Sequence, residues 1–193
     1  MPRDAISVVR NVPVVTSLPA SPADGEEVYY RFAQLVSPAN PLVNLWHLRW
    51  DQAGGWWLPV GEQVPVYAFD GVQRSASIGA GGWGTNITPL CTATVPRPGS
   101  YRIEFGSQSF WAGTVGNWFL GLARASGWPG TPPGGGGLIV AVPSTATYDS
   151  AAGSNLIVAA SGETFTHGVY LQATGGTETN LGRYIKLFPI SLN

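Results

Sequence analysis

The feature that most constrains the fold is the spacing of glycine and proline along the chain. The sequence has 26 glycines and 16 prolines among its 193 residues, and they separate short runs of β-branched and aromatic residues. Glycine and proline weaken helices, whereas β-branched and aromatic residues favour strands. No window keeps an apolar period of 3.6 residues over three turns. We therefore predict an all-β chain with many turns.

Alternating apolar and polar residues mark two of the expected strands most clearly. In residues 100–107, Tyr101, Ile103 and Phe105 alternate with Arg, Glu and Gly, and residues 184–192 show a similar alternation. This pattern is typical of strands with one buried face. Seven or eight short strands bounded by turn residues predict an antiparallel β-sandwich or jelly roll.

A second, smaller β unit is expected before the sandwich. Residues 26–34 are rich in strand formers, and residues 45–51 alternate around tryptophan. The Ala-Gly-Gly sequence at 53–55 supplies a tight reversal, so residues 45–51 and 56–60 are predicted to pair as an aromatic hairpin. The tryptophans expected to cluster there are Trp50, Trp56 and Trp57.

These features divide the chain into three parts. Residues 1–21 are short, polar and proline-containing, which predicts an N-terminal anchoring arm and linker. Residues 22–70 form the aromatic β-hairpin module, and residues 71–193 form the jelly-roll β-sandwich domain. The segment 125–137, which combines three prolines with a run of glycines, is predicted to be a long exposed loop.

The charge content favours burial in an assembly. Only 11% of the residues are charged, against about 25% in ordinary soluble domains, and the net charge is −1. The basic residues are scattered singly, so no basic stripe is present that could neutralise a phosphate backbone. We expect protein partners and no nucleic-acid binding.

Membrane insertion, disulfides and cofactors are not expected. The sequence has no run of 18 apolar residues, and its charged N-terminus does not resemble a signal peptide, so we expect synthesis in a cytoplasm. Cys91 is the only cysteine, which excludes an intrachain disulfide, and no Cys/His cluster has the spacing of a zinc site. We predict neither metal nor other cofactor.

Candidate catalytic residues are few. His47 could pair with Glu26, Glu27 or Asp51, but no nucleophile motif accompanies it, and a structural role is the better interpretation. His167 could be proposed as a metal ligand together with His47, but two histidines make a weak zinc signal, so hydrogen bonding in a loop is preferred. We predict that the protein is not an enzyme.

Four tryptophans have the surroundings of a binding surface. Each lies beside Gly, Ser or Asn, as aromatic platforms for sugar rings often do, and each can bury about 150–250 Å². Packing in the core or between subunits is the preferred interpretation, and contact with a glycan or receptor is the alternative. The four residues are Trp83, Trp111, Trp118 and Trp128.

The N-terminal half resembles minor tail and fibre proteins of tailed bacteriophages. The resemblance covers residues 22–61 through PADGEEVYYRFAQ, NLWHLRWD and AGGWWLPVG, with weaker phrases at 96–105 and 184–192. In that family a similar opening and an aromatic-glycine turn precede a jelly roll. The motif residues, to which the resemblance assigns a structural role, are Asp24, Gly25, Tyr29, Tyr30, Trp46, His47, Leu48, Arg49 and Trp50.

The C-terminal part is similar to the trimeric jelly roll of complement and tumour-necrosis-factor heads, in which a PG.Y.I.F phrase forms an inner strand. Together the resemblances imply a homotrimeric virion protein of the tail, tail tip or fibre. It would be made in the bacterial cytoplasm, bind other virion proteins through its N-terminal arm and contact a host-surface glycan or receptor. Two alternatives stay open: a capsid decoration or head-spike protein, and a carbohydrate-binding adhesin module.

Overall fold

The structure is a computed structural model that describes residues 11–33, 36–37, 43–78, 81–84, 90–112, 118–124, 139–142, 149–171 and 176–193. Every regular element in these ranges is a strand, as the all-β prediction requires. The strands are β1 (Val14–Val15), β2 (Glu27–Ala33), β3 (Val36–Ser37), β4 (Val43–Asp51), β5 (Trp56–Pro59), β6 (Val66–Asp70), β7 (Arg74–Ile78), β8 (Gly82–Gly84), β9 (Thr92–Thr94), β10 (Gly99–Ala112), β11 (Trp118–Arg124), β12 (Ile139–Val142), β13 (Asp149–Ala159), β14 (Thr164–Leu171) and β15 (Gly176–Leu192).

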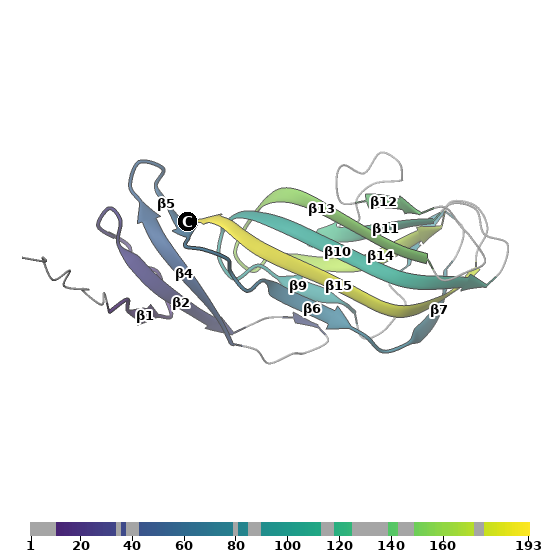
Figure 1. The fold of residues 1–193 in the computed structure, drawn as a ribbon. Helices are drawn as coiled ribbons and strands as arrows, with labels where there is room; N and C mark the ends of the chain where they lie inside the picture. Colours follow the sequence, from purple (N-terminus) through teal and green to yellow (C-terminus); the bar gives the residue numbers. More distant parts are fainter. Residues whose placement is uncertain are drawn as a thin grey trace, which may run out of the picture.

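The strands form two sheets that pack face to face, with the hairpin module extending from one end (Figure 1). The nine-stranded sheet has the order β1-β2-β4-β5-β15-β10-β13, with β6 and β7 also paired to β15. The six-stranded sheet has the order β12-β11-β14-β9-β3, with β8 also paired to β14. The predicted antiparallel jelly-roll sandwich is confirmed.

Strand β15 is the longest strand and organises the large sheet. One of its edges pairs with β10 from Gly99↔Leu192 to Ala112↔Thr177. Its other edge meets β5, β6 and β7 in succession along its length. Figure 1 shows the C-terminus beside β5, where β15 leaves the sandwich and meets the hairpin module.

The aromatic hairpin is confirmed. Strands β4 and β5 pair from Leu48↔Pro59 to Asp51↔Trp56, and the reversal ends at Gly55, whose φ of 71° suits glycine. The Trp50 and Trp57 rings lie 5.5 Å apart. Trp56 folds over Gly54, where a Cβ would lie 2.3 Å from the indole. Trp50 and Trp57 therefore pair at the hairpin end, whereas Trp56 is exposed and packs on Gly54.

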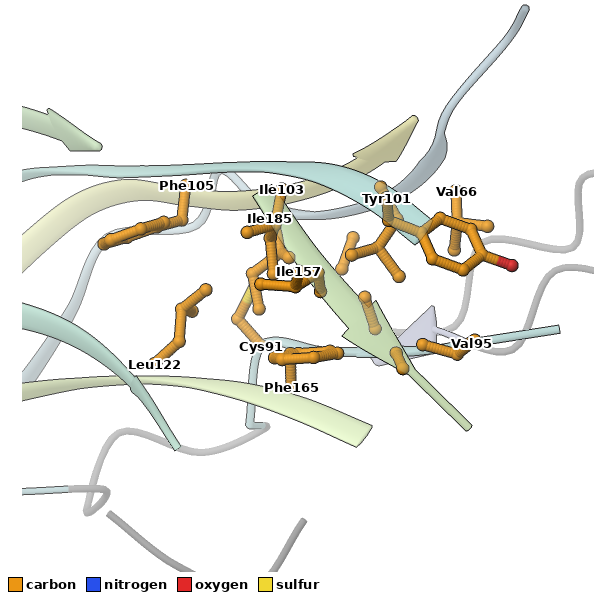
Figure 2. Close-up of a cluster of buried hydrophobic side chains, with 14 of the residues drawn as sticks. Val66, Cys91, Val95, Tyr101, Ile103, Phe105, Leu122, Ile157, Phe165 and Ile185 are labelled. Carbon is orange, nitrogen blue, oxygen red and sulfur yellow. The ribbon is translucent and has the colours of Figure 1, made fainter. Parts of the chain in front are cut away.

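The core follows the alternation seen in the sequence. Tyr101, Ile103 and Phe105 of β10 and Ile185 of β15 are fully buried. Figure 2 shows them facing Leu122 and Phe165 of the opposite sheet and Cys91, which precedes β9, with Ile157 of β13 beside them. Trp46 of β4 lies 6.3 Å from Tyr101 between ring centroids, so the hairpin module and the sandwich share one buried cluster.

The boundary between the hairpin module and the sandwich near Asp70 stays a prediction. It would separate β6 from its partner strand β15. Strand β6 lies on the hairpin side of that boundary but pairs with β15 over five residues, from Val66↔Leu187 to Asp70↔Arg183. On the N-terminal side, β1 adds to β2 in parallel, and Tyr29 N donates to Pro13 O at 2.8 Å. Residues 1–10 of the predicted arm and the predicted loop 125–137 lie outside the described residues.

Candidate functional site

The outward side of the nine-stranded sheet carries large apolar side chains. In β13, Ile157 and Ala159 point into the core, while Leu156 and Val158 point outward and are 68% and 71% exposed. In β15, Ile185 and Leu187 are buried, while Phe188 and Ile190 take outward positions. An antiparallel sheet with one wet face normally has polar residues outward. At this end, the sheet carries apolar side chains on both faces.

We call Leu156, Val158, Phe188 and Ile190 the apolar patch. Leu156 and Phe188 both lie opposite Arg102 of β10, one on each side of it. The Arg102 guanidinium carbon lies 4.4 Å from the Phe188 ring centroid, where the cation stacks on the aromatic face. Leu156, Phe188 and Ile190 also line a shallow hollow of about 390 Å³. Arg102 of β10 therefore lies between the β13 and β15 parts of the patch, with its guanidinium stacked on Phe188.

A row of charged residues limits the apolar patch toward the β7 end of the sheet. Glu104 forms an ion pair with Arg102, with 3.2 Å between Arg102 Nε and Glu104 Oε1. Glu104 also lies opposite Lys186 in the sheet. The Lys186 ammonium lies 5.4 Å and 5.2 Å from the ring centroids of Tyr67 and Tyr184. The outward face thus has an apolar end, a charged middle and an aromatic far end.

The structure separates the four tryptophans proposed for glycan contact. Trp118 begins β11 and is fully buried in the core cluster, which favours the core interpretation of this residue over glycan contact. Trp83 lies in β8 and Trp111 in β10, but their side chains lie outside the described part of the structure. Trp128 falls outside the described residues altogether.

The motif residues at the start of the module shape a turn. Asp24 Oδ1 accepts a hydrogen bond from Gln52 N at 3.1 Å, and Gly25 N donates to Trp50 O at 3.1 Å. Gly25 has a φ of 74°, which a side chain would disfavour. The Asp-Gly pair therefore fixes the turn before β2 against the tip of the β4–β5 hairpin.

The remaining motif residues build the module's two faces. Trp46, Leu48 and Tyr30 are buried, and Trp46 Nε1 donates to Val64 O at 2.7 Å. On the other face, His47 stacks on Tyr29 with ring centroids 4.6 Å apart, and Arg49 is exposed.

His47 has the structural surroundings that the sequence favoured. Of the three carboxylates proposed as its partners it pairs with Glu27, at 3.1 Å from Nε2 to Oε2. The backbone N–H of His47 donates a hydrogen bond to Gln63 Oε1 at 2.8 Å. Both contacts hold the strand in register, and the described residues place no nucleophile in this pair.

His167 lies in a different environment from the one predicted. It sits within β14, not in a loop, and is 97% buried, and its backbone N–H donates to Cys91 O at 2.9 Å. Its Nε2 has no hydrogen-bond partner. Burial, together with the nearby Arg183 cation, lowers the pKa of His167 to about 3. The imidazole is therefore neutral and part of the core.

A buried ion-pair cluster lies close to His167. Asp70 Oδ2 accepts hydrogen bonds from Arg74 Nε at 2.7 Å and Arg183 at 2.9 Å, and Asp70 and Arg183 are each 3% exposed. Burial raises the pKa of Asp70, but the hydrogen bonds from the two arginines outweigh it and hold that pKa below its ordinary value. Burial also raises the pKa of Cys91 to about 12, so its thiol is unreactive.

Among the described residues, no three His, Cys, Asp or Glu side chains gather as a metal site would require. No helix in that part of the chain has the length and apolarity needed to cross a membrane.

No protein-family model and no curated protein matches the chain. Among solved structures, it is similar to Eiger TNF from S. frugiperda, with 10% identity and a TM-score of 0.43 over 68% of this chain and 96% of that one. It is also similar to a carbohydrate-binding module of Cellvibrio mixtus lichenase 5A in complex with cellotriose, with 18% identity and a TM-score of 0.34 over 65% and 98%. Both likenesses are distant and assign no function to this chain.

Proposed function

We propose that the chain is a non-catalytic structural protein of a virus particle that assembles with copies of itself through the apolar patch. The observation that carries this proposal is the pair of outward residues in β13, Leu156 and Val158, on a sheet whose inner face already forms the core. Where a sheet carries apolar side chains on both faces, it is expected to be covered on both.

The energetics favour association. Removing apolar surface from water contributes roughly 25 cal/mol per Å², and a stable interface buries about 800 Å² on each partner. Four apolar side chains and the stacked Arg102 supply the water-excluding centre that such an interface needs. The low charge content of the chain leaves few groups whose desolvation would oppose burial.

The proposed number of copies in the assembly and its proposed place in the particle are both inferred from the sequence. The likeness to complement and tumour-necrosis-factor heads supports a homotrimer, and the phage-like phrases of residues 22–61 support a tail, tail-tip or fibre protein. In this arrangement the N-terminal arm binds another virion protein, and the sandwich projects outward. A capsid decoration or head-spike protein would use the same apolar patch.

Purified virus particles from a host that carries this sequence test the proposal. Quantitative mass spectrometry should find peptides of this chain in the particles, at a copy number that is a multiple of three. Intact particles that lack the chain while the infected cells contain it would contradict the virion assignment.

A further inference from the structure

A second hollow lies at the β7 end of the outward face, beyond the charged row of Glu104 and Lys186. We call it the aromatic hollow; its volume is about 430 Å³, within the range of roughly 300–1,000 Å³ found for small-molecule sites. Strands β6, β10, β13 and β15 contribute its walls, and no residue of the apolar patch lines it.

Two aromatic rings of the hollow lie over glycines. A Cβ on Gly106 would lie 2.6 Å from the Tyr184 ring, and a Cβ on Gly71 would lie 2.8 Å from the Phe69 ring. Each ring therefore covers backbone where a side chain would otherwise stand. Phe69 is 49% exposed and stacks on Tyr67 at 5.8 Å with an interplanar angle of 16°. The rings are held in place by the protein while Phe69 keeps half of its surface in solvent.

A β-bulge and small residues make the space between the rings. The pairing of β10 with β15 passes from Gln108↔Gly182 to Ser109↔Asn180, which leaves Leu181 as an extra residue in β15. Such bulges bend a strand and redirect its side chains, often beside binding sites. The hollow is also lined by Ala151, Ala152 and Gly182. Two of these have only a methyl side chain and glycine has none, so they leave the space open.

The polar groups at the hollow are uncharged. Gln108 and Ser150 are exposed lining residues, and Tyr184 adds a phenol hydroxyl. Of the described residues that line the hollow, none carries a charge. An amide and hydroxyls offer both hydrogen-bond donors and acceptors without selecting for an ionic ligand.

From this geometry we propose that the aromatic hollow binds a neutral carbohydrate. A pyranose ring has an apolar C–H face that fits against the aromatic faces of Phe69 and Tyr184, and hydroxyl groups that fit the Gln108 amide and the Ser150 hydroxyl. This activity is separate from self-assembly, because the apolar patch lies on the other side of the charged row.

Titration of the full-length protein with methyl β-glucoside, methyl β-galactoside and N-acetylglucosamine, followed by NMR, tests the proposal. At least one of these sugars should shift the amide signals of Gly106, Gly182 and the Gln108 side chain in a saturable manner, with a dissociation constant in the millimolar range. Absence of saturable shifts with all three, or shifts with glucuronate only, would overturn it.

Matched variants connect the signal to the hollow. Phe69→Ala and Tyr184→Ala should each weaken binding by about tenfold, the loss expected for one stacked ring, whereas Tyr184→Phe keeps the ring and most of the affinity. Gly182→Ala should also weaken binding without unfolding the sheet, because the nearest atoms to its Cβ are 3.9 Å away.

A variant of the apolar patch separates this proposal from the proposed function. Leu156→Asp should change the oligomeric state and leave the sugar-induced shifts intact. Unchanged affinity in both Phe69→Ala and Tyr184→Ala would overturn the assignment of the sugar to this hollow, whatever the oligomeric state.

Discussion

At the scale of single residues, the interior of the sandwich holds His167. Its imidazole stays neutral over a pH range in which the same side chain becomes protonated in the unfolded protein. The pKa of His167 falls from 6.5 to about 3 because burial and Arg183 disfavour its charge. Between these two values the unfolded chain binds a proton that the folded chain does not. Its contribution to stability is therefore complete above pH 6.5 and is lost as the pH falls toward 3.

The variant His167→Leu should reduce the acid sensitivity of folding. Each pH unit within the window costs the unmodified protein up to about 1.4 kcal/mol of unfolding free energy, and the variant lacks this slope. At pH 7 it should be at least as stable, because it removes a buried Nε2 that has no partner. Urea unfolding at several pH values checks both points. An unchanged slope between pH 6.5 and 4 would contradict the assignment.

The buried carboxylate of Asp70 should matter more than surface charges. Asp70→Asn leaves the Arg183 cation buried beside a neutral group, so we expect a loss of about 3–5 kcal/mol in unfolding free energy. The control is Glu104→Gln, which breaks the half-exposed pair with Arg102 and should cost about 1 kcal/mol or less. Equal losses in the two variants would mean that the cluster does not stabilise the fold in this way.

The sequence predicted the inward residues better than the candidate binding residues. Alternation placed Tyr101, Ile103 and Phe105 in the core because a strand's period of two is local information. Core packing was the preferred interpretation of Trp118, but the alternation could not exclude glycan contact, because small and polar neighbours are compatible with either environment. The position of the Tyr184 ring depends on Gly106 in the neighbouring strand β10, which no local pattern could indicate.

At the scale of strands, the free edge of the large sheet is protected at one end. Strand β13 is the last strand on its side. Near its end, Arg124 donates to Val158 O, and the N–H of Ala160, the residue after β13, donates to Glu163 at 3.0 Å. Arg124 and Glu163 also form an ion pair. Because exposed edge strands promote association between sheets, these contacts favour assembly through the face over assembly through the edge.

Arg124→Ala should therefore promote aggregation. Without its guanidinium, the Val158 carbonyl becomes available to a strand of another molecule, so we expect particles larger than the native assembly that grow with concentration. Dynamic light scattering detects them. The control Arg49→Ala removes an exposed arginine from the interior strand β4 and should leave the size distribution unchanged; growth in both variants alike would refute edge protection.

The order of the strands could be predicted only in part. The β4–β5 hairpin could be predicted from the two glycines between its strands, because a hairpin depends only on neighbouring segments and the tight turn that joins them. The pairing of β15 with β5, β6 and β7 joins segments more than 90 residues apart, and local patterns do not encode such pairings. Similarly, LIVA at 156–159 is apolar at four successive positions, which identifies a strand apolar on both faces but not what covers each face.

At the scale of the whole molecule, disruption of the apolar patch should dissociate the assembly. Leu156→Asp combined with Val158→Asp places two charges at the proposed interface, and we expect monomers with unchanged far-UV circular dichroism, since both side chains point away from the core. Val72→Asp is the matched control, because Val72 is 58% exposed but lies outside the patch. Dissociation of the control, or an intact assembly in the double variant, would contradict the proposal.

If the outward face of the large sheet joins copies of this chain, the unmodified protein in solution has a mass that is a multiple of the chain mass. Multi-angle light scattering should give about three times the chain mass of 20.3 kDa, independent of micromolar dilution. A mass of one chain at every concentration would contradict self-assembly through the apolar patch.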